Sequence, residues 1–411
     1  MNTPQVSCRS CGKVELITIL SLGKTPLANA LLTREQLSQQ ERIFDLDLVF
    51  CPSCSLVQIT ETVSPEKLFR EYFYLSSFSE TMLRHSEENV NELIQSRKLD
   101  GSSFVVEIAS NDGYLLQYYK RGGVPVLGIE PARNIAQTAV DRGIPTLCEF
   151  FDAELAQKLV AEGKRADIVH ANNVLAHVPD LNGFVSGIQR LLKNSGVAVI
   201  EVPYVKDMID RNEFDTIYHE HLCYFSLTAL DHLFRRHGLL IEDVKRLDIH
   251  GGTVRIYARK QDGENNSRSA VVDEMLAEEV AWVRNDEFYR GFGEGVEQLR
   301  RDLVGMLSGL KAEGKRIAVY GASAKGSTLL NYFGLGSPVL DFVVDRSTVK
   351  QGHYTPGTHL PIYSPAVLLK EKPDYVLLLT WNFADEILQQ QDEYRKQGGR
   401  FIIPIPQVRV V

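Results

Sequence analysis

The sequence predicts an α/β protein with two parallel sheets and a small metal-binding region in front of them. With 411 residues the chain is too long for one ordinary hydrophobic core, so two or three domains are expected. Short β-branched runs alternate with helix-length segments in two separate stretches, a pattern typical of parallel sheets covered by helices. Ahead of both stretches, four of the six cysteines form two C-x-x-C pairs.

The N-terminal region, residues 1–75, opens with "CRSCGK" and returns with "FCPSCSLVQ", whose end reads as a strand. Each C-x-x-C is a tight turn that directs two sulfurs to one point. Four thiolates from two such turns close a tetrahedral zinc shell with no open position, which makes a structural site. Four unrelated buried thiols or a redox pair are the alternatives, and the matched pairs disfavour both. The predicted zinc ligands are Cys8, Cys11, Cys51 and Cys54.

Residues 76–262 are expected to form a central α/β domain that begins with a helix capped by a serine of "YFYLSSFS". The run "SFVVEIAS" then reads as a strand that turns through "NDGYLL" into a helix, and "VPVLGIEPARN" repeats this design. Ligands of such sheets bind at the carboxyl ends of the strands. We therefore expect a binding site at the turns that follow these strands.

The turn "EIASNDGYLL" lacks the G-x-G of a dinucleotide fingerprint, because Ala109 and Asn111 stand where glycines would lie. Glu130 follows about 20 residues later, where a carboxylate can accept from two ribose hydroxyls. Acids around a turn without a phosphate cradle suit S-adenosylmethionine (SAM) better than NAD. The residues assigned to this cofactor from the turn and the second strand are Glu107, Ala109, Asn111, Asp112, Gly113 and Glu130.

A charged amphipathic stretch, residues 263–313, predicts one or two helices that link the central domain to a C-terminal Rossmann-like domain, residues 314–411. Its first unit, "YGASAKGSTLLNY", reads as a strand, a turn of small residues and a helix. Such a turn can hold a diphosphate through backbone N–H groups and the ammonium of Lys325. A domain that only packs against its neighbour is the alternative.

The segment "FDTIYHEHLCYFS" places two histidines and a glutamate within four residues. A neutral imidazole suits proton abstraction near pH 7. Metal binding and a simple ion-paired loop are the alternatives; no further ligands lie nearby at metal spacing, which disfavours a catalytic metal. In an extended segment Tyr218 and Glu220 would face one way, and His219 and His221 the other.

Together these motifs resemble the C-methyltransferases of deoxysugar biosynthesis, which act on nucleotide-linked 4-keto sugars. The matching elements occur in family order over nearly the whole chain: the cysteine pairs, "YFYLSSFS", "EIASNDGYL", "ANNVLAHVPD", "IYHEHLCYFS", "HGGTVR" and "GASAKGSTLLNY". The resemblance implies a class I methyltransferase sheet at the centre, with the sugar nucleotide, usually dTDP-linked, between it and the C-terminal domain. It implies methylation at carbon 3, beside the keto group.

The resemblance also implies roles for individual residues. His221 is expected to be the base that removes the proton, with Tyr218 and Glu220 in support. Tyr74 is expected to be a donor in the pocket, with Tyr72 as the alternative because it lies two residues away and can share its face. His177 is expected to be a polar group near the reaction centre. The same comparison adds Asn172 and Asn173 to the cofactor residues, and the expected substrate contacts are His219, Ser323, Lys325 and Asn331.

Composition limits the partners of the chain. A formal net charge of −8 disfavours a sequence-independent grip on nucleic acid, so an adaptor role for the cysteine region is disfavoured. No apolar run approaches a membrane span, and we expect a cytoplasmic monomer or weak homo-oligomer without membrane contact. The remaining alternatives are another small-molecule acceptor and an NAD-dependent oxidoreductase, which the absence of G-x-G-x-x-G disfavours.

Overall fold

The computed structural model describes residues 6–70, 75–249, 251–261 and 267–411, and three sheets organise them. The order of the N-terminal sheet is β1-β2-β3-β9, and all its strands are antiparallel. Its strands are β1 (Ile17–Pro26), β2 (Ile43–Phe50), β3 (Val57–Ile59) and β9 (Cys223–Tyr224). We call residues 6–63, which contain the four predicted zinc ligands and β1 to β3, the cysteine module. The fourth strand of this sheet therefore comes from the middle of the chain, inside the histidine-rich segment.

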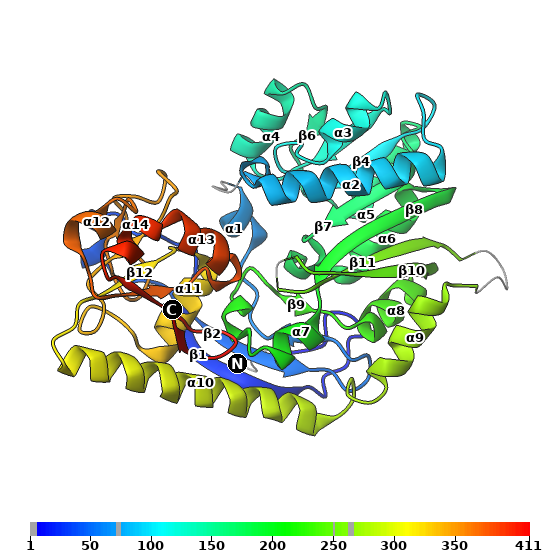
Figure 1. The fold of residues 1–411 in the computed structure, drawn as a ribbon. Coiled ribbons are helices and arrows are strands. Elements are labelled where there is room, and N and C mark those ends of the chain that lie inside the picture. Colours follow the sequence, from blue (N-terminus) through cyan, green and yellow to red (C-terminus); the bar gives the residue numbers. More distant parts are fainter. Residues whose placement is uncertain (1–5, 71–74, 250, 262–266) are drawn as a thin grey trace.

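The central sheet has seven strands in the order β10-β11-β8-β7-β4-β5-β6, and β11 runs antiparallel to its neighbours (Figure 1). Its strands are β4 (Val105–Ile108), β5 (Val126–Ile129), β6 (Thr146–Leu147), β7 (Ala166–Asn172), β8 (Leu192–Pro203), β10 (Leu239–Leu247) and β11 (Thr253–Lys260). Its helices are α2 (Glu80–Arg97), α3 (Leu116–Arg121), α4 (Arg133–Asp141), α5 (Ala153–Ala161), α6 (Leu181–Leu191), α7 (Val205–Asp210) and α8 (Leu227–Arg236). A short helix, α1 (Pro65–Phe69), leads into this part of the chain.

Side-chain alternation along the central strands makes this a three-layer structure. Val105 on β4 packs into the core beneath α2 and α3, whereas its neighbour Val106 packs into the core beneath α5, α6 and α8. The helix predicted after "YFYLSSFS" is present, and the hydroxyl of Ser79 accepts from the backbone N–H of Met82 at 3.3 Å. This confirms a sheet whose strands β4 to β8 are parallel, covered by helices on both faces.

The C-terminal sheet has the order β14-β13-β12-β15-β16-β17 and is parallel except for β17. Its strands are β12 (Ile317–Tyr320), β13 (Val343–Val344), β14 (Ile362–Tyr363), β15 (Tyr375–Leu378), β16 (Arg400–Ile403) and β17 (Arg409–Val410). Its helices are α11 (Ala324–Phe333), α12 (Val367–Glu371), α13 (Ala384–Gln390) and α14 (Asp392–Lys396). The α/β fold class with three parts is thus confirmed.

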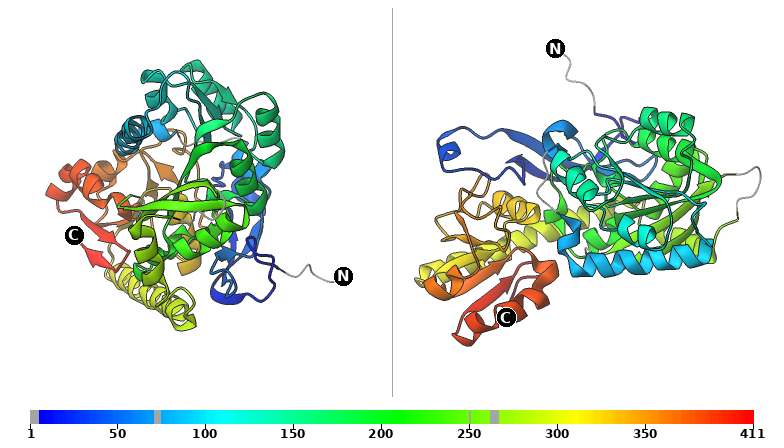
Figure 2. Two further views of the ribbon diagram at one scale, coloured as in Figure 1. Left: turned by 90° about the vertical axis from the view of Figure 1, so that its right-hand side faces the viewer. Right: turned by 90° about the horizontal axis from the view of Figure 1, so that it is seen from above.

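Two helices connect the central and C-terminal sheets, α9 (Ala270–Glu279) and α10 (Asp286–Ala312), and α10 runs along the base of the molecule (Figure 1). The cysteine module lies alongside both sheets (Figure 2). It reaches the C-terminal part through a β-bridge between Leu32 and Tyr354 and through Glu41, whose carboxylate accepts from the N–H of Gly357 at 2.9 Å. The cysteine module therefore contacts the C-terminal part directly.

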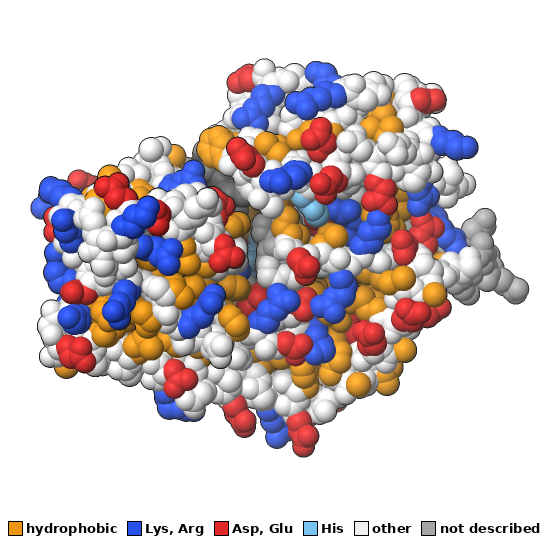
Figure 3. Space-filling model, viewed as in Figure 1, with side chains coloured by type: hydrophobic (Ala, Val, Ile, Leu, Met, Phe, Trp, Pro, Cys, Tyr) orange, Lys and Arg blue, Asp and Glu red, His pale blue; other side chains and the backbone are white. Residues whose placement is uncertain are grey.

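Acidic and basic side chains alternate over the face shown in Figure 3, and no broad basic patch is visible on the described surface of that view. Among the described residues, no helix combines the length and apolar character needed to cross a bilayer.

Candidate active site

A cavity of about 700 Å³ lies between the carboxyl ends of the central strands and the C-terminal sheet. Parallel α/β sheets bind their ligands at this edge, and the volume lies in the range of small-molecule sites. Residues from three regions line it. The turns after β4, β5 and β7 form one end. The histidine segment (residues 214–226), whose centre we call the histidine turn, forms another part of the wall, and Lys325 and Asn382 line the cavity from the C-terminal part.

The turn after β4 has an unusual backbone, since Ala109 and Asn111 both adopt positive φ, 53° and 48°. These are the two positions where the dinucleotide fingerprint has glycine. Glu130 fixes this turn, because its carboxylate accepts from the N–H of Asn111 and from the N–H of Ala132, each at 2.9 Å. Burial raises the pKa of Glu130 to about 7. The result is a carboxylate held rigidly at the rim of the cavity.

Five of the eight predicted cofactor residues line the cavity: Ala109, Asn111, Glu130, Asn172 and Asn173. Glu107, Asp112 and Gly113 do not. Glu107 lies buried on β4 behind the turn, and burial raises the pKa of its carboxyl well above the usual value. Asp112 instead pairs with Arg142 at 2.6 Å. These three residues belong to the strand and the turn but lie outside the lining of the cavity.

Sequence reasoning missed a second group of residues at this end. The segment after β6 contributes Glu149, Phe150, Phe151 and Asp152 to the lining, and α1 contributes Pro65, Glu66 and Phe69. A signal was present, because an aromatic pair and two acids follow the strand Thr146–Leu147 at the carboxyl edge of the sheet. Two aromatic rings there offer a surface on which a planar base can stack.

The histidine segment is a turn, so the prediction that its alternate residues face opposite ways is wrong. The N–H of His221 donates to the carbonyl of Tyr218 at 2.8 Å, and this closes the chain on itself. Tyr218 and His221 consequently lie together, with ring centroids 4.0 Å apart. Both line the cavity.

The hydrogen bonds of His221 identify its basic nitrogen. Its Nδ1 lies 2.8 Å from the carbonyl oxygen of Thr216, which can only accept, so Nδ1 carries the proton. Nε2 is therefore the lone-pair nitrogen, and the Tyr218 hydroxyl donates to it at 2.8 Å. Burial lowers the pKa of His221 well below its ordinary value, and His177 and Lys325 lower it further. The ring is neutral near pH 7, as a general base must be.

His177 lies beside this ring, with centroids 4.9 Å apart. Its Nδ1 donates to the backbone carbonyl of Glu220 at 2.7 Å, so its Nε2 is also unprotonated. Burial lowers the pKa of His177 as well. Two neutral imidazoles thus lie side by side in the cavity wall, and a proton on one disfavours a proton on the other.

Glu220 and His219 are directed away from the cavity lining. The carboxylate of Glu220 accepts from Asn29 of the cysteine module at 2.7 Å, and burial raises its pKa to about 7. The imidazole of His219 lies 3.1 Å from the backbone carbonyl of Asp45 and packs against Phe44. The prediction for Tyr74 concerns a position outside the described residues.

On the C-terminal side, Lys325 lines the cavity, with its ammonium 4.7 Å from the ring centroid of Trp381. Ser323 caps α11 by accepting from the N–H of Gly326 at 3.1 Å. The side-chain amide of Asn331 donates to the carbonyls of Ser327 and Pro356. Ser323 and Asn331 lie outside the lining, so of these three predicted contacts the cavity brings in Lys325 alone.

The cavity also contains polar residues that the sequence did not single out, among them Glu213 and Asn382. Burial raises the pKa of Glu213 to about 8, and the nearby Lys325 opposes this shift. Close by, the buried carboxylate of Asp215 accepts from Nε1 of Trp381 at 2.7 Å. This contact joins the histidine segment to the C-terminal part directly beside Lys325.

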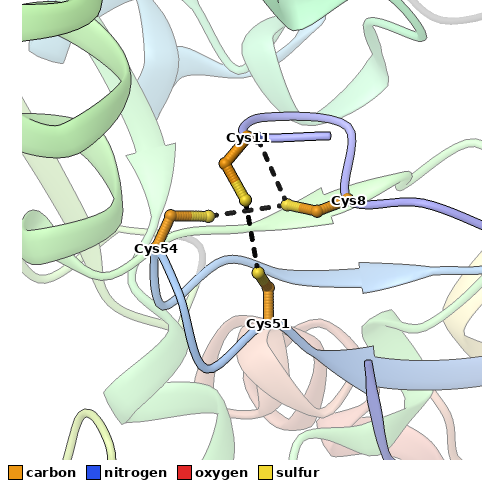
Figure 4. Close-up of side chains that lie close together, drawn as sticks. All are labelled: Cys8, Cys11, Cys51 and Cys54. Carbon is orange, nitrogen blue, oxygen red and sulfur yellow. Dashed lines mark hydrogen bonds between the residues drawn. The ribbon is translucent and has the colours of Figure 1, made fainter. Parts of the chain in front are cut away.

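The four predicted zinc ligands converge from two turns (Figure 4). All four sulfurs lie within 4.8 Å of one another, and the Cys8–Cys54 and Cys11–Cys51 pairs are each 3.5 Å apart. A tetrahedral Zn²⁺ with bonds of about 2.3 Å places its sulfurs about 3.8 Å apart. The donor set and its spacing therefore fit one zinc ion.

Comparisons with known proteins bear on the whole chain. Three family models match it: "Putative zinc binding domain" over residues 8–69, "Methyltransferase domain" over residues 78–244 and "C-methyltransferase C-terminal domain" over residues 248–406. The C-methyltransferase NovU of Streptomyces niveus is 38% identical over 409 residues, which cover 99% of this chain and 97% of NovU. The chain belongs to the C-methyltransferase family. It is a SAM-dependent enzyme, and the oxidoreductase alternative is set aside.

More distant relatives match the methyltransferase over part of its length. The ubiquinone biosynthesis O-methyltransferase of Bartonella tribocorum is 25% identical, over 34% of this chain and 58% of its own. The crystal structure of magnesium protoporphyrin IX methyltransferase from Synechocystis aligns with a TM-score of 0.34 and 14% identity, over 44% of this chain and 79% of its own. That similarity is too distant to say more about this C-methyltransferase.

Proposed function

We propose that this enzyme methylates carbon 3 of a nucleotide-diphosphate-linked 4-keto-deoxysugar, with dTDP as the nucleotide, and that His221 is the base. The observation that carries the proposal is the unprotonated Nε2 of His221 in the cavity wall, paired with a tyrosine hydroxyl. Carbon methylation requires a carbanion, and a carbon beside a ketone provides one when a base removes its hydrogen.

The proposed first step is removal of a proton by His221. Nε2 of His221 takes the proton from carbon 3, the electron pair of that C–H bond becomes the double bond between carbons 3 and 4, and the π pair of the carbonyl moves onto the keto oxygen. The hydroxyl of Tyr218, released from Nε2, donates to the enolate oxygen. His177 lies beside His221, with ring centroids 4.9 Å apart, and a neutral ring there leaves room for one positive charge on the pair. When bound, SAM would supply a methyl group whose bond to the sulfonium sulfur breaks as the bond to carbon 3 forms, the electron pair staying on sulfur.

SAM, the methyl donor, and the sugar nucleotide, the acceptor, are proposed to bind at different ends of the cavity. At the donor end, Glu130 offers a fixed carboxylate for ribose hydroxyls, with Ala109, Asn111, Asn172 and Asn173 around it. At the other end, Lys325 offers one positive charge for a diphosphate. The supporting role of Glu220 is to orient His177 through its backbone carbonyl. Tyr74 is proposed as a further donor in the pocket.

Two further proposals concern the whole chain. The cysteine module binds one structural Zn²⁺, which no step of the reaction uses. The chain works as a cytoplasmic monomer or weak homo-oligomer divided into residues 1–75, 76–262, 263–313 and 314–411. With a boundary at residue 75, β9 belongs to the central part of the chain but is the fourth strand of the N-terminal sheet.

The test is hydrogen exchange at the acceptor carbon. A panel of nucleotide-linked 4-keto sugars is incubated in D₂O with enzyme but without SAM, and mass spectrometry follows deuterium at carbon 3. The wild type is expected to incorporate deuterium, and His221→Asn to lose both exchange and methylation while calorimetry shows unchanged SAM binding. His232→Asn, a change at an exposed position on α8, is the matched control. Near-normal turnover by His221→Asn would overturn the assignment.

A further inference from the structure

The histidine turn is held from two sides, by the central part through His177 and Ala176, which bond the backbone of Glu220 and Leu222, and by the cysteine module. His219, at its centre, is 1% exposed and places Nε2 3.1 Å from the backbone carbonyl of Asp45 on β2. Its ring packs against Phe44 with centroids 5.6 Å apart. Asn29, in the loop after β1, donates to the buried carboxylate of Glu220 at 2.7 Å. Two neighbours of His221 in the turn are thus anchored outside the central sheet.

The residues after His221 are anchored in the same way. The N–H of Ile59 on β3 donates to the carbonyl of Leu222 at 3.0 Å, and β9 then pairs with β3 as an added strand. The hydrogen bonds of the His221 ring, to Thr216 and Tyr218, are local to this segment. The position of His221 in the cavity therefore depends on what holds the turn.

The strand that receives β9 is tied to the cysteine cluster. Cys51 and Cys54 stand just before β3, and the N–H of Cys51 donates to the carbonyl of Leu56 at 2.9 Å. Gln58, a buried residue of β3, accepts from the N–H of Arg9 at 2.8 Å and donates to the carbonyl of Ser7. These two residues flank Cys8. Both cysteine turns and β3 consequently form one unit, which four thiolate–metal bonds would close.

We propose that the cysteine module positions the catalytic turn, with His219 as a positioning residue and the metal-bound cysteines as the support of strand β3. This inference rests on the proposed role of His221 as the base. A displacement of about 1 Å at a reacting group can cost about 100-fold in rate without touching the chemistry. The module would then contribute to catalysis although none of the four cysteines lines the cavity.

The first test compares two substitutions of His219 in the full chain. His219→Leu removes the donor to Asp45 and is expected to lower kcat by about 10- to 100-fold, with the dissociation constant for SAM unchanged. His219→Gln keeps a donor at that point and is expected to recover most of the loss. His232→Leu, at an exposed position on α8, controls for the loss of an imidazole. Equal kcat for His219→Leu and wild type would overturn the proposal, as would equal losses in the two His219 variants.

The second test has a structural readout. Zinc is removed from the loaded enzyme with a chelator, and amide hydrogen exchange is followed by mass spectrometry. Peptides covering residues 217–224 are expected to exchange about ten times faster, while those of β4 and β7 keep their protection. Restoring Zn²⁺ should restore the slow rate. Unchanged exchange in residues 217–224 after metal removal would overturn the proposal.

The two proposals fail in different ways. If His221→Asn stays active, the assignment of the base is wrong whatever the exchange data show. If His221→Asn is inactive while His219→Leu and metal removal leave kcat and local exchange unchanged, only the positioning role is wrong.

Discussion

The hydroxyl of Tyr218 lies 2.8 Å from Nε2 of His221, on the nitrogen that remains unprotonated because Nδ1 donates to Thr216. A substrate hydrogen can reach this lone pair only when the hydroxyl turns away. The same movement frees the hydroxyl to donate to the oxygen on which the negative charge develops. Under the proposed mechanism, one contact would shield the base before the substrate binds and supply a donor when it reacts.

Tyr218→Phe is expected to lower kcat about 100-fold, the usual cost of losing one donor to a developing oxyanion. The hydrogen bond that Tyr218 donates to Nε2 stabilises the neutral form of His221, so its loss should raise the pKa of His221. The acid limb of the rate profile should therefore move to higher pH. Steady-state kinetics from pH 5 to 9 measure both effects. Tyr363→Phe, at an exposed residue, is the control. An unchanged kcat would rule out the proposed donor role.

SAM binding is expected to weaken as pH falls through about 7. Burial raises the pKa of Glu130 to about 7, so its carboxylate is present above that pH and is lost below it. Losing one charge-assisted hydrogen bond corresponds to about a tenfold weaker affinity between pH 8 and pH 6. Calorimetry across this range measures it. Glu130→Gln should bind SAM weakly at every pH and lack the step, and a variant that keeps the step would contradict the assignment.

Lys325→Met is expected to raise KM for a nucleotide-linked acceptor about tenfold and to leave SAM affinity unchanged, because one charge–diphosphate contact is lost. The wild-type KM should also rise with salt more steeply than that of the variant. Lys370→Met, at an exposed residue of α12, serves as control. A variant whose KM matches the wild type would show that the diphosphate binds elsewhere.

One equivalent of zinc per chain is expected by elemental analysis, and Cys51→Ser should reduce it strongly because one of four thiolates is lost. The midpoint of thermal unfolding should fall with it. Cys148→Ser is the control, since Cys148 is exposed and lies outside the cluster. A folded preparation free of metal would argue against zinc as a structural ion.

The sequence predicted those features that depend on local order. The turn after β4 was predictable because a strand, a turn and a helix follow one another directly, and the zinc ligands because each C-x-x-C is a local unit. The histidine turn was predicted with the wrong geometry. Its shape follows from contacts across long separations, such as Asn29 with Glu220, which are 191 residues apart. Trp381 and Asp215 are 166 residues apart, and the sequence between them gives no sign of their contact.

The same limit explains the predicted contacts that lie outside the cavity. Ser323 and Asn331 stand on the helix that carries Lys325, and a sequence motif cannot distinguish side chains that cap or bridge from those that reach a ligand. Helix capping and the link to Pro356 account for both. The motif located the right helix and left open which of its faces is turned to the cavity.

The pairing of β3 with β9 has a consequence for how the chain is made. Residue 223 of 411 must leave the ribosome before the N-terminal sheet can acquire its last strand. Until then β3 is an open edge, the kind of surface on which nascent chains associate. Fragments that stop short of this residue are therefore expected to be poorly soluble, and the first sixty residues should not be obtainable as a well-behaved separate protein.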